Sequence, residues 1–140
     1  MFDNVDRAGL IRQALEAVPG AYAPYSEYYV GAAALFSSGK IYTGVNVENA
    51  SYPAGICAER NAIFHAVAEG ERVLEAIAIV SGKKGVITDY SSPCGICRQV
   101  MREFGDPKKV LVLLAKTPED YIEKTLEELL PDSFGPENLS

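Results

Sequence analysis

Two short stretches of the sequence contain residue types that can do chemistry together. Cys57 and Glu59 lie in PAGICAERN, and Cys94 and Cys97 lie in PCGIC. Both stretches fall where a helix is expected to begin after a loop, and a helix N-terminus carries partial positive charge that favours thiolate over thiol. In a sheet whose strands are followed by helices, such helix starts meet at one edge. We therefore expect the three cysteines to converge on one site.

The cysteines allow three interpretations. Cysteine is among the most buried residue types, so all three could be core thiols. Cys94 and Cys97 also form the Cys-x-x-Cys pair of a thiol oxidoreductase, although this leaves Cys57 and Glu59 without a role. Three thiolates can instead supply three of the four tetrahedral ligands of Zn²⁺. We favour zinc, because two separate stretches with the same placement at helix starts are hard to ascribe to packing.

The fourth zinc position decides between a structural and a catalytic site. The only histidine, His65, follows Cys57 by eight residues on the same expected helix. That spacing is about 12 Å along the helix axis, too far to share an ion whose ligand bonds are about 2 Å long. An open position holds water and lowers its pKa toward neutrality. Glu59 could then take a proton from the water and pass it to a substrate nitrogen, although a first-turn glutamate can also merely complement the helix N-terminus.

Length and composition are those of one globular domain, residues 1–140. The chain has 48% hydrophobic residues and a net charge of −6, with no long run of basic residues. This charge disfavours a nucleic-acid partner, which would need a cationic patch. No apolar stretch approaches the ~18 residues of a membrane span, and the first residues lack the pattern of a signal peptide. We therefore expect a cytoplasmic protein without a membrane partner.

Hydrophobic periodicity and turn residues predict the element order α-β-β-α-β-α-β-α. Alternating strands and helices favour an α/β fold, with one mixed sheet and helices on its faces. Thr117 is expected to cap the last helix, with Pro118 at its first position. The expected segments are helix 4–18, strands 30–36 and 40–47, helix 57–69, strand 75–81, a polar connection 82–93, helix 94–104, strand 109–115 and helix 117–130.

Longer stretches of the sequence resemble a known family. VGAAAL, GVNVENASYPAGICAERNA, SPCGICRQVMREFG and ELLPDSF, in this order and spacing, closely resemble the small homotetrameric cytidine deaminases with all-cysteine zinc ligands. The resemblance runs from about Tyr25 to Phe134, and it includes the zinc deaminase signature. It implies a three-layer α-β-α sandwich with a mixed five-stranded sheet. The implied activity is hydrolytic deamination of cytidine and deoxycytidine to uridine and deoxyuridine in pyrimidine salvage.

The resemblance also implies roles for the residues of the two cysteine stretches. Cys57, Cys94 and Cys97 would bind one Zn²⁺ per subunit, and Glu59 would carry protons. Arg60 resembles the arginine that offsets excess negative charge in all-cysteine members of the family. Such an offset is physically reasonable, because three thiolates and one Zn²⁺ sum to a charge of −1.

Substrate contacts follow from the same resemblance. Asn46 and Glu48 match the Asn-x-Glu that holds the ribose hydroxyls, and backbone groups at Ala58 and Cys94 would read the pyrimidine edge. An amide and a carboxylate are suited to bind sugar hydroxyls. A deaminase of a modified cytosine nucleoside, of the blasticidin type, is the related alternative, although the Asn-x-Glu pair favours an ordinary ribose.

Three aromatic residues complete the expected site. Phe134 and Tyr52 resemble positions that reach across a subunit contact to complete a neighbour's pocket, which implies a homotetramer with shared active sites. Tyr28 stands where the family usually has a phenylalanine flanking the base. A tyrosine can still stack there, but its hydroxyl needs a hydrogen-bond partner when it is buried.

Overall fold

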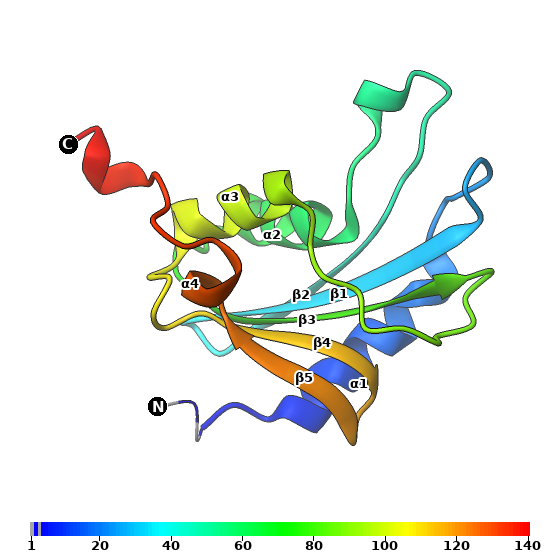
Figure 1. Cartoon of the computed structure of the whole chain (residues 1–140), viewed down its shortest axis with the longest axis horizontal. Helices are drawn as coiled ribbons and strands as arrows, with labels where there is room; N and C mark the ends of the chain where they lie inside the picture. Colours follow the sequence, from blue (N-terminus) through cyan, green and yellow to red (C-terminus); the bar gives the residue numbers. More distant parts are fainter. Residues whose placement is uncertain (1, 3) are drawn as a thin grey trace.

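The computed structural model describes residues 2 and 4–140, which form a three-layer α-β-α sandwich (Figure 1). The strands are β1 (Tyr28–Phe36), β2 (Ile41–Val45), β3 (Leu74–Lys83), β4 (Leu111–Thr117) and β5 (Asp120–Thr125). The helices are α1 (Arg7–Ala17), α2 (Ala58–Ala68), α3 (Gly95–Phe104) and α4 (Leu126–Leu129), with 3₁₀ turns at Val18–Gly20, Tyr52–Ala54 and Pro136–Asn138. No helix in this part of the chain has the length and hydrophobicity needed to cross a membrane.

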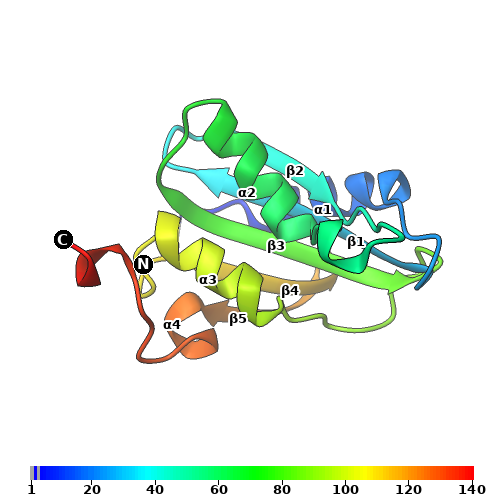
Figure 2. The ribbon, with the colours of Figure 1, turned by 90° about the horizontal axis from the view of Figure 1, so that it is seen from above.

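The five strands form one mixed sheet in the order β2-β1-β3-β4-β5. Strands β3 and β4 are parallel, and every other neighbouring pair is antiparallel. Helix α1 covers one face, and α2, α3 and α4 cover the other (Figures 1 and 2). The predicted fold class, an α-β-α sandwich with a mixed five-stranded sheet, is confirmed.

The alanine-rich strand β1 contributes side chains to the cores on both faces of the sheet. Successive side chains of a strand point to opposite faces, so Ala33 packs in the α1 core while Ala32 and Ala34 pack in the core beneath α2 and α3. Small side chains on both faces let the two helical layers approach the sheet closely. The nearly all-apolar β4 is buried at Leu111 through Ala115, as its sequence predicted.

Gly44 fixes the position of α2 over the sheet. A Cβ atom at Gly44 would lie 2.4 Å from the backbone nitrogen of Ala62 and 2.6 Å from the carbonyl oxygen of Ala58. Only a residue without a side chain allows this contact between the backbones of β2 and α2. The first turn of α2, which contains Glu59, is therefore held directly against the sheet.

Helices α2 and α3 begin next to each other. Cys57 is the N-cap of α2 and Cys94 is the N-cap of α3, each in an extended backbone conformation. The two helices lie side by side and run in the same direction (Figure 2). The prediction that both cysteine stretches stand at helix starts is confirmed.

The helix predicted over 117–130 is wrong. Strand β4 continues to Thr117, and the chain turns back as β5 before the short helix α4 begins. The Thr117 hydroxyl accepts a hydrogen bond from the backbone of Glu119 at 3.2 Å, so it stabilises a turn instead of capping a helix. The real cap is Thr125, which forms a capping box with Glu128. Strand β5 is thus the fifth strand, which the resemblance implied and the segment prediction lacked.

Candidate active site

The three cysteines form a cluster that fits a zinc ion. Their Sγ atoms all lie within 4.8 Å of one another, and those of Cys57 and Cys94 are 3.9 Å apart. Sulfur ligands of a tetrahedral Zn²⁺ with bonds of about 2.3 Å are separated by about 3.8 Å. Cys97 is buried behind the other two, and all three thiols are free. The cluster is therefore positioned to hold a metal ion with three protein ligands.

The cluster already favours negative charge on sulfur. Hydrogen bonds from Cys97, Arg60 and Cys94 lower the pKa of Cys57 to about 5. The pKa of Cys97 is raised, because its thiol donates to Cys57 and is buried. Cys97 thus keeps its own proton while Cys57 loses one, and a bound metal ion would displace the proton of Cys97.

Arg60 lies against the thiol cluster. Its Nη2 atom is 3.4 Å from the Cys57 sulfur, and its hydrogen bond to that thiolate raises the pKa of Arg60. Within the described residues, its buried Nε atom has no hydrogen-bond partner. The guanidinium charge is therefore directed at the sulfur atoms, consistent with charge compensation.

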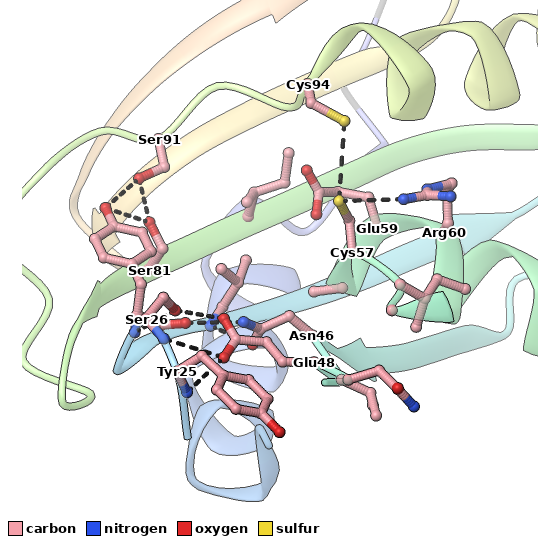
Figure 3. A pocket seen from close by; sticks show the side chains of 18 of the residues that line it. Tyr25, Ser26, Asn46, Glu48, Cys57, Glu59, Arg60, Ser81, Ser91 and Cys94 are labelled. Atoms are coloured by element: carbon pink, nitrogen blue, oxygen red, sulfur yellow. Dashed lines mark hydrogen bonds between the residues drawn. The ribbon is translucent and has the colours of Figure 1, made fainter. Parts of the chain in front are cut away.

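Glu59 is a buried carboxyl group beside the thiols. The residue is 5% exposed, and Figure 3 shows its side chain next to Cys57 and Cys94. Burial, together with the charge on Cys57, raises the pKa of Glu59 to about 7, and Arg60 opposes this shift. A carboxyl group with this pKa can both accept and donate a proton near neutral pH.

One pocket of about 610 Å³ opens over this cluster. Its wall is built from the start of β1, the segment after β2, the first turn of α2, the end of β3 and the loop before α3. Cys97 lies beneath the pocket, buried against the core. The predicted site residues that line the pocket are Tyr28, Asn46, Glu48, Tyr52, Cys57, Ala58, Glu59, Arg60 and Cys94.

Besides the buried Cys97, Phe134 is the predicted site residue that does not line this pocket. Its side chain is 58% exposed, and its backbone carbonyl accepts a hydrogen bond of 2.9 Å from the Gln99 side chain. Tyr52 lies at the pocket and is 76% exposed, with its ring 6.1 Å from that of Tyr25 between centroids.

Glu48 is held by a turn that the sequence reasoning missed. Its Oε1 atom accepts from the backbone nitrogens of Tyr25 at 3.0 Å and Ser26 at 3.1 Å, and its Oε2 atom accepts from the Ser26 hydroxyl (Figure 3). The hydrogen bond from the Ser26 hydroxyl is the main cause that lowers the pKa of Glu48. Glu48 is therefore a fixed anionic acceptor in the pocket. The local clue was the short polar sequence Tyr25-Ser26-Glu27 that precedes β1.

Asn46 is fixed by the backbone of β1. Its Oδ1 atom accepts from the nitrogen of Val30 at 2.9 Å, and its Nδ2 atom donates to the carbonyl of Tyr28 at 2.8 Å. The Nδ2 amide carries a second N–H, which can donate to a ligand. Asn46 thus both ties β2 to β1 and lines the pocket.

The Tyr28 hydroxyl has two partners that the sequence reasoning also missed. It lies 3.1 Å from the Ser91 hydroxyl and 3.2 Å from the Ser81 hydroxyl. The sequence feature that could have indicated Ser81 is its position in β3. Residues two apart in a strand share a face, so Ser81 lies on the same face of the sheet as Ile77 and Ile79. Ser91 precedes the Pro-Cys of the thiol stretch and carried no signal of its own.

Comparisons with known proteins agree with this geometry. Residues 5–114 match the family described as the cytidine and deoxycytidylate deaminase zinc-binding region. A cytidine deaminase from Halalkalibacterium halodurans is 45% identical over 136 residues, which is 97% of this chain and 99% of the relative. The crystal structure of a cytidine deaminase from Burkholderia pseudomallei has a TM-score of 0.81 at 44% identity, covering 90% of this chain and 97% of the other. A second structure, cytidine deaminase from Mycobacterium tuberculosis, has a TM-score of 0.79 at 41% identity, covering 95% of this chain and 100% of the other.

The fold and the thiol cluster beside a buried carboxyl group define a metal site of the catalytic type. With these matches, the chain belongs to the cytidine and deoxycytidylate deaminase family, whose shared region binds zinc. The resemblance found in the sequence is confirmed.

Proposed function

We propose that this chain catalyses the zinc-dependent hydrolytic deamination of cytidine and deoxycytidine to uridine and deoxyuridine. The observation that carries the proposal is the cluster of three thiols beside Glu59, in the same pocket as Asn46 and Glu48. One end of the pocket is thus equipped for hydrolysis and the other for a sugar. Relatives that are named cytidine deaminase and match over nearly the whole chain support the same activity.

The residues around the thiols divide the chemistry between them. Cys57, Cys94 and Cys97 would hold a Zn²⁺ ion, which would act as a Lewis acid and lower the pKa of water. Glu59, with a pKa of about 7, would accept a proton from water at its carboxylate and give it to the ring nitrogen N3. It would then accept a second proton, from the new hydroxyl group on C4, and give it to the amine, which leaves as ammonia. Hydrogen bonds from Cys97 and Arg60 favour the thiolate form of Cys57.

The pocket orients a cytosine nucleoside in one direction. The reacting carbon C4 lies toward the thiols, so the sugar on N1, at the opposite end of the ring, lies toward Asn46 and Glu48. The anionic Glu48 makes charge-assisted hydrogen bonds to sugar hydroxyls. Backbone groups at Ala58 and Cys94, at the starts of α2 and α3, read the polar edge of the base.

We further propose a homotetramer in which neighbouring subunits complete each pocket. The exposed Phe134, which lies outside its own pocket, and the exposed Tyr52 support this arrangement. Light scattering on the purified protein tests the oligomeric state, and four chains per particle is the expected result. Subunits carrying Phe134→Ala can also be refolded together with subunits carrying Glu59→Gln. Activity above that of either variant alone would show that Phe134 acts in a neighbouring site, and no gain would contradict it.

The proposal includes the cellular role. We propose a single catalytic domain over residues 1–140 that acts on free nucleosides in cytoplasmic pyrimidine salvage, without a nucleic-acid or membrane partner. A thiol oxidoreductase is not favoured, because Cys57 and Glu59 share the site with the Cys-x-x-Cys pair.

Product analysis tests the proposed activity. Purified protein incubated with cytidine should release uridine and ammonia in equal amounts, with deoxycytidine behaving likewise. Blasticidin, assayed in parallel, should be a poor substrate because it lacks an ordinary ribose. Absence of uridine from a zinc-loaded sample would overturn the proposal.

A further inference from the structure

Three hydroxyl groups meet in one wall of the pocket. They come from Tyr28 at the start of β1, Ser81 near the end of β3 and Ser91 in the loop before α3. The Tyr28 oxygen lies 3.1 Å from that of Ser91 and 3.2 Å from that of Ser81. The two serines also hydrogen-bond to each other (Figure 3). We call these three residues the hydroxyl triad.

The hydroxyl triad belongs to a pocket wall that also includes the apolar residues Val30 and Ile79. Ser81 is fully buried, whereas Tyr28 and Ser91 are partly exposed to the pocket. Ser81 is therefore a positioning residue, and the oxygens of Tyr28 and Ser91 are the ones that a ligand can reach.

The triad can both donate to and accept from a ligand. Each hydroxyl has one proton and two lone pairs, so a ring of three hydrogen bonds leaves one lone pair free on each oxygen. If Ser81 donates to Ser91 and Ser91 donates to Tyr28, the Tyr28 proton can turn into the pocket. A small hydroxyl group, which is itself both donor and acceptor, complements this arrangement.

The orientation of the base decides which part of a substrate meets the triad. This step rests on the proposed function. With C4 at the thiols, N3 at Glu59 and the sugar at Asn46 and Glu48, the remaining edge of the cytosine ring carries C5 and C6. In Figure 3, Ser81 and Ser91 lie on the side of the pocket away from Glu59 and Arg60. The C5 edge therefore faces the hydroxyl triad.

We propose that Tyr28, Ser81 and Ser91 form a subsite for a small hydrogen-bonding substituent at C5 of the cytosine ring. The subsite makes the enzyme prefer a 5-hydroxymethyl group over a 5-methyl group of nearly the same size. A methyl group in contact with the triad leaves its hydroxyls without a ligand partner, whereas a hydroxymethyl group provides one.

The test compares kcat/KM for 5-hydroxymethylcytidine and 5-methylcytidine, with cytidine as the reference substrate. Tyr28→Phe and Ser81→Ala should each lower the ratio of the two values by about fivefold, the scale of one neutral hydrogen bond. Tyr29→Phe is the matched control, because Tyr29 is adjacent in β1 and packs on the α1 face of the sheet. It should leave the ratio unchanged. Thermal melts confirm that each variant is folded.

Binding of the products gives a second readout that needs no turnover. By calorimetry, the wild type should bind 5-hydroxymethyluridine more tightly than 5-methyluridine. Tyr28→Phe should lose this preference. If cytidine is deaminated but neither ratio changes in the two variants, the subsite is refuted while the proposed function stands. If cytidine itself is not deaminated, the proposed function fails. The binding measurement then decides the subsite by itself: if Tyr28→Phe still prefers 5-hydroxymethyluridine over 5-methyluridine as the wild type does, the subsite is refuted as well.

Discussion

Replacing Glu59 by glutamine removes a proton carrier and keeps the size of the side chain. The wild-type carboxyl group is 5% exposed and has a pKa of about 7, so it exchanges protons near neutral pH, which an amide cannot do. General acid–base groups contribute about 10²- to 10⁴-fold to a rate. We therefore expect kcat for cytidine to fall at least about 100-fold, which is about 3 kcal/mol of transition-state stabilisation. Zinc content should stay the same, because the cluster of thiols does not include Glu59.

The assay follows the loss of cytidine absorbance under saturating substrate, with zinc measured by mass spectrometry in the same sample. Glu69→Gln is the matched control, because Glu69 is the exposed C-cap residue of the same helix α2. It should be as active as the wild type. Turnover near the wild-type level in Glu59→Gln, at full zinc occupancy, would remove Glu59 from the proton-transfer role. Loss of zinc together with activity would instead make Glu59 a metal ligand.

Three further substitutions test the support around the site. Cys94→Ala should bind less than one zinc per chain and melt at a lower temperature, because the ion links the starts of two helices; a full equivalent of zinc would contradict the ligand set. Ser26→Ala, which removes a hydrogen bond to Glu48, should raise KM for cytidine about threefold to tenfold with a smaller change in kcat, and an unchanged KM would argue against this positioning role. Gly44→Ala should lower the free energy of unfolding in urea by about 2 kcal/mol, because the new methyl group overlaps the α2 backbone; a wild-type midpoint would show that α2 can shift without penalty.

The convergence of the cysteines could be predicted because it depends on local signals. Cys57 precedes a run of good helix formers, and Cys94 begins a segment that Gly105 and Pro107 close. Both cysteines prove to be N-caps. Helix starts that follow strands of one sheet meet at one edge, so their sequence positions were sufficient to place them together. The distance of about 12 Å along the helix between Cys57 and His65 also predicted that His65 is not a zinc ligand. In the structure, His65 is exposed, and its ring lies 5.3 Å from the ring of Tyr42 between centroids.

The C-terminal third shows where local signals compete. The sequence Thr-Pro-Glu at 117–119 satisfies both a helix N-terminus and a tight turn, and apolar residues around 121–130 recur at helical spacing. Residues 120–125 form a strand because they pair with β4, and a local sequence pattern carries no information about that pairing. Strand β5 is an edge strand with charged residues such as Glu123 and Lys124, so it lacks a strong apolar alternation. The capping box from Thr125 to Glu128 was the overlooked sign that the helix starts later.

The partners of the pocket side chains could not be predicted for a different reason. Tyr28 and Ser81 are 53 residues apart, and their contact exists only because β1 pairs with β3. The need of the Tyr28 hydroxyl for a partner was foreseeable from chemistry, but the identity of that partner required the register of the sheet. The same holds for Ser26, whose contact with Glu48 joins the segments that precede β1 and follow β2.

The most direct test of the account is a zinc titration of cytidine turnover. The protein is stripped of metal by a chelator at reducing conditions, zinc is returned in steps, and the deamination rate is measured at each step. The account predicts no turnover without metal and a linear rise that ends at one zinc per chain. Turnover that is unaffected by metal removal, or a fully zinc-loaded protein that leaves cytidine intact, would contradict it.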